Sequence, residues 1–301
     1  MSLFAKIRDV WRGRDKLPDV VGINRRNVEL VYAYNKRKDY PLVDDKIVCK
    51  ALMEAQGVPV APTVAVCEGL FDIPRVMNIL RERDNFVIKP ANGSGGDGIV
   101  VTGARTATGW LTAKGRDMSE DEAVNHFANI VFGAYSKQLD DRAFVEERIV
   151  PHPLFHEFYS GGVSDIRLIF LKGTCLISMV RIPTKTSGGR ANLHQGGIGV
   201  AVDIETGMTT RAVFRGNSVT DHPETGKPLV GRQLPDWEAI HDVARRAAAC
   251  VPLGYVGVDV VVDAERGPLI LELNARPGLE IQNINGFPLG PIVDAALAHE
   301  L

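Results

Sequence analysis

Three oxygen-bearing side chains near the end of the sequence could together hold a metal ion. Asp259 stands in the apolar stretch VGVDVVVD, and Glu272 and Asn274 stand two residues apart in the apolar stretch LILELN. Because side chains alternate along a strand, Glu272 and Asn274 are predicted to share one face. Acids in apolar strands are costly to bury without a partner, and oxygen ligands suit Mg²⁺ that also binds substrate phosphates. The pattern favours a metal site over a solvated hairpin.

A glycine-rich segment, ANGSGGDGIVV, follows Lys89. Gly93, Gly95 and Gly98 match the pattern G-x-G-x-x-G, but the β-branched residues after it indicate a strand where a dinucleotide-binding fold would have a helix. Glycine permits positive φ angles, so successive backbone N–H groups of such a loop can lie along phosphate oxygens. Lys89 would add an ammonium group at the end of the incoming strand. We predict a phosphate-binding loop, with a flexible hairpin tip as the alternative.

Polar and cationic residues also interrupt the apolar strands between these two motifs. Arg167, in SDIRLIF, either pairs with a buried acid such as Asp165 or faces a site, and Arg181 lies in SMVRIP. The segment GGRANLHQGG has glycine pairs at both ends and is predicted to be a mobile loop that presents Arg190, Asn192 and His194. Asn192 is the better candidate for a phosphate or metal contact, and His194 as a general base is the weaker one.

The elements that position these residues are predicted to alternate between helices and strands. One helix is expected over residues 44–57 with Asp44 as its N-cap. Ser119, followed by Glu122, predicts a capping box at the start of another helix. The second half of the chain contains several strands joined as hairpins, and residues 215–235 are predicted to form a long surface loop. The fold class is therefore mixed α/β, and a purely parallel sheet is not expected.

Composition narrows the class of protein. The chain has 301 residues, 45% of them hydrophobic, which is enough for one large or two medium domains. A net charge of −2 gives no global field for nucleic acid or an anionic membrane. No segment approaches the roughly 20 apolar residues of a membrane span, and the N-terminus lacks the apolar core of a signal peptide. We therefore expect a cytoplasmic protein without a nucleic-acid partner or stable membrane insertion.

The order of these motifs resembles the ATP-grasp superfamily and, within it, the RimK-type alpha-L-glutamate ligases. The likeness covers roughly residues 44–300 and rests on DDKIVCKALMEAQGVPVAPT, VIKPANGSGGDGI, FVEERI, SDIRLIF, RANLHQGG, GVD and ELNARPG. It implies an ATP-grasp fold in which two lobes clamp ATP, with a small lobe at 44–145 and a catalytic lobe at 146–301. A basic helical segment, 1–43, stands where these ligases usually carry a Rossmann-like domain.

The resemblance also implies roles for individual residues. The implied ATP-binding residues are Lys46, Lys89, Gly93, Ser94, Gly95, Gly96, Glu146, Glu147, Arg148 and Ile149. Of these, Glu146, Glu147 and Arg148 form the hinge whose backbone and first acid meet the adenine. The implied metal ligands are Asp259, Glu272 and Asn274. The resemblance implies that Arg167 faces the phosphates and that Arg276 contacts the acyl substrate, and with Asn192 of the mobile loop these are the predicted catalytic residues. The implied cofactors are ATP and Mg²⁺, with Mn²⁺ as a possible substitute.

Charge alone suggests where a substrate would bind. Arg181, Arg190 and Arg276 are predicted to form a small positive pocket for an acidic substrate such as glutamate or a peptide C-terminus, with His194 nearby. The substrate side is expected to be closed by the basic N-terminal segment, by residues 203–237 or by a second copy of the chain. Self-association with an amino-acid or peptide-like substrate is the favoured combination.

Taken together, these motifs predict an ATP- and Mg²⁺-dependent ligase that joins a carboxylate to an amine through an acyl-phosphate. No serine or cysteine nucleophile is required, and the four cysteines are expected in the core. Two alternatives stay open. The same fold and metal site could serve a kinase that phosphorylates a small molecule, or the chain could be a non-catalytic nucleotide-binding module.

Overall fold

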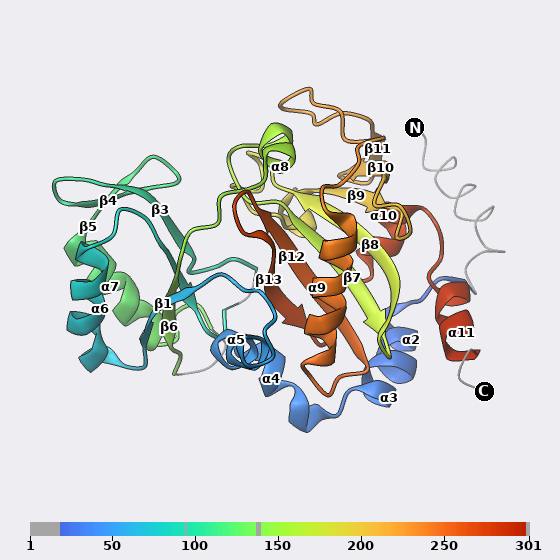
Figure 1. The fold of residues 1–301 in the computed structure, drawn as a ribbon, viewed down its shortest axis with the longest axis horizontal. Coiled ribbons are helices and arrows are strands. Elements are labelled where there is room, and N and C mark those ends of the chain that lie inside the picture. Colours follow the sequence, from blue (N-terminus) through green and yellow to red (C-terminus); the bar gives the residue numbers. More distant parts are fainter. Residues whose placement is uncertain (1–18, 94, 137–139, 299–301) are drawn as a thin grey trace, which may run out of the picture.

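The computed structural model describes residues 19–93, 95–136 and 140–298 (Figure 1). Two lobes lie side by side in it, each built on its own antiparallel sheet. The smaller sheet has the strand order β1-β6-β2-β3-β4-β5, and the larger has the order β11-β10-β9-β8-β7-β12-β13. The prediction of a mixed α/β fold without a purely parallel sheet is confirmed.

The small lobe packs two amphipathic helices, α6 (Ile73–Arg81) and α7 (Glu120–Val131), against its sheet. The predicted capping box of α7 is confirmed, because Ser119 Oγ accepts the Glu122 amide and the Glu122 carboxylate accepts the Ser119 amide. Leu70–Asp72 forms a short 3-10 turn before α6. The six strands are β1 (Thr63–Cys67), β2 (Val87–Pro90), β3 (Val100–Arg105), β4 (Gly109–Thr112), β5 (Asp117–Ser119) and β6 (Ala143–Glu146).

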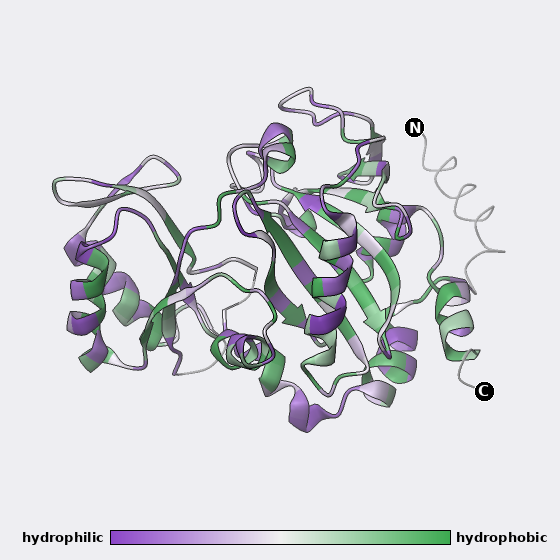
Figure 2. Ribbon diagram, in the orientation of Figure 1, coloured by the Kyte–Doolittle hydropathy of each residue, from purple (hydrophilic) through white to green (hydrophobic). Residues whose placement is uncertain are grey.

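The large lobe holds the main hydrophobic core. Helix α9 (Trp237–Ala249) packs on β12 and β13, and its buried residues recur at helical spacing. Figure 2 shows hydrophobic strands in this lobe and hydrophilic residues interspersed along α9. Helix α10 (Glu280–Asn285) packs on β8 to β10, and α8 (Pro153–Phe158) and α11 (Gly290–Ala298) complete the lobe. The seven strands are β7 (Asp165–Leu171), β8 (Thr174–Ile182), β9 (Ile198–Val202), β10 (Thr209–Phe214), β11 (Asn217–Val219), β12 (Tyr255–Asp263) and β13 (Gly267–Asn274).

The N-terminal segment, residues 19–43, is helical as predicted and lies against the large lobe (Figure 1). Asn35 fastens it, because its Nδ2 donates to the carbonyl oxygens of Tyr255 and Ala275 at 2.7 and 2.9 Å and its Oδ1 accepts the Tyr255 amide. Residues 1–18 of the predicted basic segment lie outside the described residues. The helical pieces are α2 (Ile23–Arg25), the π-helix η2 (Arg26–Val31), α3 (Tyr32–Tyr34), the 3-10 helix η3 (Arg37–Asp39) and α4 (Pro41–Asp44).

Helix α5 (Lys46–Ala55) corrects one predicted boundary. Its N-cap is Asp45 and not Asp44, because Asp44 still belongs to α4 whereas Asp45 is extended and its Oδ1 accepts the amides of Ile47 and Val48. Cys49 on α5 packs in the large-lobe core. The division of the chain at residue 44 stays a prediction, and this packing shows that α5 contributes to the larger core.

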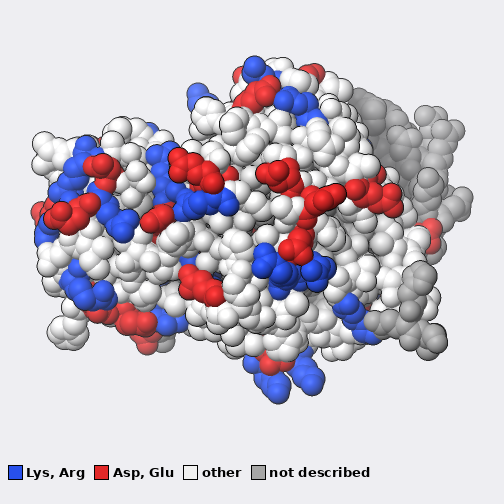
Figure 3. Space-filling model, viewed as in Figure 1, with Lys and Arg blue, Asp and Glu red and all other residues white. Residues whose placement is uncertain are grey.

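The prediction that residues 215–235 form one long surface loop is only partly correct. Residues 215–216 form the turn between β10 and β11, and β11 pairs antiparallel with β10. The residues after β11 run through turns that include two isolated bridges, Asp221–Pro228 and Met208–Gln233. The described residues contain no helix long and apolar enough to cross a bilayer. On the face drawn in Figure 3, basic and acidic side chains of the described residues are interspersed.

Candidate active site

The glycine-rich loop joins two strands, as predicted, because β2 and β3 pair antiparallel on either side of it. Gly95, Gly96 and Gly98 have φ angles of +66°, +80° and +75°, which residues other than glycine rarely adopt. A Cβ atom on Gly93 would lie 2.4 Å from Pro90 Cγ. The loop therefore depends on bare backbone at these positions, which is what close contact with phosphate oxygens requires. Ser94 lies outside the described residues.

Lys46 connects this loop to helix α5. It is the first residue of the helix, and its Nζ donates to the carbonyl oxygen of Gly93 at 2.5 Å. Its backbone amide donates to the carbonyl oxygen of Ala91 at 3.0 Å. Both contacts place the ammonium group beside the predicted phosphate-binding loop.

Lys89 lies with Lys50 on either side of Glu146. Lys50 Nζ is 2.5 Å from one oxygen of the Glu146 carboxylate, and Lys89 Nζ pairs with the other, all three residues being buried. Burial alone would raise the pKa of Glu146, but the two ammonium groups outweigh it and hold that pKa below its usual value. Lys50 was not predicted. Its signal was available, since it stands one turn after Lys46 among apolar residues of the same helix.

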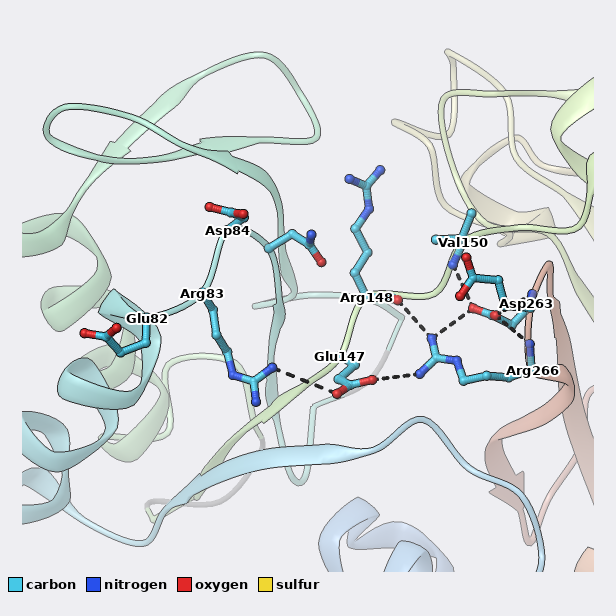
Figure 4. Close-up of a pocket in the computed structure, with 10 residues that line it drawn as sticks. Glu82, Arg83, Asp84, Glu147, Arg148, Val150, Asp263 and Arg266 are labelled. Atoms are coloured by element: carbon cyan, nitrogen blue, oxygen red, sulfur yellow. Dashed lines mark hydrogen bonds and ion pairs between the residues drawn. The ribbon is translucent and has the colours of Figure 1, made fainter.

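The hinge residues Glu147 and Arg148 and the adjacent Ile149 contact different parts of the protein. Ile149 is buried against Val261 and Leu269. Glu147 is 3.1 Å from Arg266 of the large lobe and 3.9 Å from Arg83 of the small lobe, and Arg266 also donates to the carbonyl oxygen of Arg148. Figure 4 shows these side chains converging on Glu147 from both lobes, while the Arg148 side chain points away from the ion pairs. A cavity of about 440 Å³ lies here, and Glu147 and Arg148 line it.

A buried chain of charges crosses the large sheet. Arg167 lies opposite Asp259 in the β7–β12 register and donates to both of its oxygens, at 2.7 and 2.5 Å. Arg181 donates to Asp259 and to Asp165, each at 2.6 Å. The Asp165–Arg167 pair considered as an alternative is therefore wrong. Each acid pairs with an arginine of a neighbouring strand.

Among the acids of this row of charges, the pKa of Asp259 is lowered, whereas the pKa values of Asp165 and Glu272 are raised. Burial raises the pKa of Asp165 to about 7, with Arg181 opposing that shift and Asp259 adding to it. Burial acts in the same direction on Asp259, but Arg167 and Arg181 outweigh it and lower its pKa well below the usual range. Burial and the charge of Asp259 raise the pKa of Glu272, against the opposing charge of Lys46. The arginine nearest to Glu272 is Arg167, at 4.0 Å, whereas Asp165 and Asp259 each have an arginine within 2.6 Å, so a bound cation would stabilise Glu272 most.

The predicted metal ligands share one face of the β12–β13 hairpin. Asp259 lies opposite Glu272 in the register, and Asn274 Nδ2 is 3.4 Å from Asp259 Oδ2, which leaves the amide oxygen of Asn274 available. Arg167 Nη2 is 4.0 Å from Glu272 Oε1. Within the described part of the chain, no cluster of three or more His, Cys, Asp or Glu side chains could hold a metal ion by itself. Both oxygens of Asp259 already accept from arginines, so Glu272 and the amide oxygen of Asn274 are the groups free to meet a cation. They fit Mg²⁺ only if phosphate oxygens or water complete its shell.

The loop after β8 reaches the glycine-rich loop. Arg190 Nη1 is 3.0 Å from Asp97 Oδ1, and the Arg190 side chain lies against Gly96. Asn192 caps the 3-10 turn Leu193–Gln195, because its Oδ1 accepts the amide of His194, whose side chain is exposed. A segment of the large lobe thereby covers the predicted phosphate-binding loop of the small lobe.

The prediction that Arg181, Arg190 and Arg276 form one positive pocket is wrong, because the three arginines lie in separate places. Arg181 is bound to the buried acids described above, and Arg190 pairs with Asp97. Arg276 points to the N-terminal segment, where its guanidinium lies 4.8 Å from the Tyr40 ring and 3.3 Å from Asp44. Charge alone could not separate the three arginines, because their surroundings depend on strand register and on the packing of the N-terminal segment.

A family model for sugar-transfer associated ATP-grasp proteins matches residues 25–295. The chain belongs to this ATP-grasp family. The predicted membership of the ATP-grasp superfamily is thereby confirmed. Among solved structures, the ATP-grasp chain is similar to a biotin carboxylase from Campylobacter jejuni with a TM-score of 0.53 and 17% identity, over 85% of this chain and 46% of that one. This likeness concerns the fold, which is the two-lobed fold expected.

Curated relatives of this ATP-grasp chain are named probable alpha-L-glutamate ligases. One from Sodalis glossinidius (strain morsitans) is 33% identical over 128 residues, which are 42% of this chain and 32% of that protein. Another, from Shewanella baltica (strain OS155 / ATCC BAA-1091), is 26% identical over 270 residues, which are 88% of this chain and 66% of that protein. The chain thus spans less than two thirds of the length of either relative.

Proposed function

We propose that this ATP-grasp protein is an ATP-dependent ligase that joins a carboxylate to an amine through an acyl-phosphate. The observation that carries the proposal is the position of Lys46. Its ammonium group contacts the glycine-rich loop at Gly93, and its charge acts on Glu272 of the metal-ligand face. This position supports a single site that contains both the loop and the acids, as a bound nucleoside triphosphate and its metal would require.

In the proposed reaction, a carboxylate oxygen of the first substrate attacks the γ-phosphorus of ATP, and the bond to the β-phosphate oxygen breaks to release ADP. The amine of the second substrate then attacks the acyl carbon, phosphate leaves and the amine loses a proton to solvent. Glu272 and Asn274 would hold Mg²⁺, with Asp259 supporting Asn274 through their contact, and the ion would supply positive charge to the phosphates. Lys46, Lys89 and Arg167 would stabilise the charge that moves to the phosphate oxygens.

The two loops also support this chemistry. An acyl-phosphate is destroyed by water, so a ligase of this kind has to exclude water while the amine binds. The Arg190–Asp97 contact brings the loop of the large lobe over the glycine-rich loop. We propose that this contact closes the site during turnover and that Asn192 and His194 face the reacting groups there.

The proposal also concerns the identity of the two substrates. The curated relatives are named as glutamate ligases, so glutamate is the first acid to test, with an amino acid or a peptide as its partner. The test is a mass-spectrometric search for condensed products when the protein is incubated with MgATP and paired amino acids or peptides. ADP release that requires the amine and yields a condensed product would support ligation. A stable phosphorylated product would indicate a kinase, and nucleotide binding without turnover would indicate a binding module.

A further inference from the structure

A second cavity, of about 650 Å³, lies between the N-terminal segment and the residues that follow β13. We call it the basic–tyrosine pocket. Its volume is within the range of small-molecule sites. Three of the lining residues are cationic, two are tyrosines and none is acidic; they are Tyr32, Asn35, Lys36, Arg37, Tyr40 and Arg276.

The cations of this pocket are available to a ligand. Lys36 and Arg37 are exposed, and within the described residues neither forms an ion pair. Among the residues that the structure describes, Asp44 is the one acidic partner of Arg276, at 3.3 Å, and both side chains are about half exposed. An ion pair this exposed contributes little. An incoming carboxylate could therefore replace Asp44 at small cost.

The walls of the pocket are nevertheless fixed. Asn35 is buried and uses its whole side-chain amide to bind Tyr255 and Ala275. Tyr40 is buried, and the guanidinium of Arg276 lies over its ring at 4.8 Å. The pocket is thus held by the core of the large lobe, and its cations extend from a rigid frame.

The pocket also adjoins the proposed metal site. Ala275, whose carbonyl oxygen accepts from Asn35, stands between Asn274 and Arg276 in the sequence. A ligand held by Arg276 would therefore lie beside the strand end that carries the metal ligands.

We propose that the basic–tyrosine pocket binds the second acidic group of the acyl substrate, so that the enzyme selects acids with at least two carboxylates, from glutamate to the end of an acidic peptide. The inference rests on the proposed function. Lys36, Arg37 and Arg276 bind the carboxylate that does not react, and the tyrosine rings pack against the apolar atoms between the two acids. Charge-assisted hydrogen bonds make this discrimination between an acid and its amide strong.

The test separates binding from turnover. Calorimetric titration, without ATP, compares glutamate with glutamine and glutamyl-glutamate with its diamide, on the wild type, on the Lys36→Ala/Arg37→Ala double variant and on Lys38→Ala. Lys38 is exposed and does not line the pocket, so it is a matched control. We expect the wild type to bind the acids at least about tenfold more tightly than the amides, the double variant to lose about tenfold or more and the control less than about twofold.

Several results would overturn the proposal. They are equal binding of acid and amide, absence of binding by every probe, or an equal loss in the control. A thermal melt of the double variant shows whether it is folded. If the acids bind as expected but no condensed product forms with MgATP, the proposed function fails and the pocket stands. If ligation proceeds with an unchanged KM for the acid in the double variant, the function stands and the pocket assignment fails.

Discussion

Arg181 shows how much a single side chain contributes to the large lobe. Its guanidinium joins Asp165 and Asp259, which are 4% and 0% exposed, and its own side chain is 14% exposed. Two buried carboxylates on adjacent strands would repel each other without it, and each would lack solvation. Arg181 therefore belongs to the support of Arg167 and Asp259, and the substrate contact predicted for it is replaced by this role.

The first prediction concerns that support. Arg181→Ala leaves Asp165 without an arginine and Asp259 with one, so we expect a loss of about 3–5 kcal/mol in the free energy of unfolding. Urea denaturation measures it. The control is Arg190→Ala, which removes the same group from an exposed ion pair with Asp97 and should cost less than about 1 kcal/mol. Equal losses in the two variants would contradict the structural role of Arg181.

Glu272 is the subject of the second prediction. Glu272→Gln keeps the shape of the side chain and removes a charge that Asp259 repels, so the protein should fold with unchanged or higher stability. If Glu272 holds the metal, turnover measured as ADP release should fall by about 10²–10³. Glu265→Gln, at the exposed turn of the same hairpin, should keep full turnover. Wild-type turnover in the Glu272→Gln variant would show that Glu272 does not hold the metal.

At the scale of elements, helix α5 packs in the large-lobe core and contacts the glycine-rich loop of the small lobe. Asp45 caps the helix with its Oδ1, and its other carboxylate oxygen pairs with Arg142, which precedes β6. The cap fixes where α5 begins and hence where Lys46 points. Lys46 in turn contacts Gly93. The start of one helix thus determines the position of a proposed ATP contact.

The third prediction compares two caps. Asp45→Ala and Ser119→Ala each remove an N-cap side chain and should each lower the free energy of unfolding by about 1 kcal/mol. Only Asp45→Ala should also raise the KM for ATP, because only α5 carries a proposed ATP contact. Paired urea denaturation and steady-state kinetics check this. Similar KM values in both variants would show that the position of Lys46 does not depend on its cap.

Sequence reasoning was most successful where one segment contains the whole pattern. The capping box at Ser119, the strand–loop–strand at Gly93–Gly98 and the shared face of Glu272 and Asn274 all follow from local spacing. Long-range pairings did not follow. The partner of Arg181 depends on the order β8-β7-β12 in the sheet, and that order is set by packing of the whole lobe.

At the scale of the whole molecule, the described residues include two contacts between the lobes besides those that α5 makes with the small lobe. The loop after β8 contacts the glycine-rich loop through Arg190 and Asp97. At the hinge, Glu147 stands between Arg83 of one lobe and Arg266 of the other (Figure 4). One contact lies at the proposed phosphate end, and the other lies beside the hinge. We expect the first to change when nucleotide binds and the second to limit how far the lobes separate.

Asp263 anchors the hinge to the large lobe, and it leads to the last prediction. Its carboxylate accepts the amide of Val150, which follows the hinge, at 2.9 Å, as well as the side chain and amide of Arg266. Asp263 is 2% exposed. Burial alone would raise its pKa, but the Arg266 guanidinium and the backbone amides outweigh burial and lower the pKa to about 2. An unfolded chain would have an aspartate pKa of about 3.9.

Because the folded pKa is the lower one, the unfolded chain takes up the proton first as the pH falls. The resulting stability, roughly 2–3 kcal/mol, is complete above about pH 5 and is lost as the pH falls from about 4 towards 2. Asp263→Asn should therefore be less stable than the wild type at pH 6, with a difference that narrows below about pH 4. Urea denaturation from pH 6 to 2.5 measures both proteins, and Glu265→Gln, an exposed acid two residues away, is the control. A difference that stays constant over this range would show that the Asp263 carboxylate stabilises the hinge through its shape and hydrogen bonds and not through its charge.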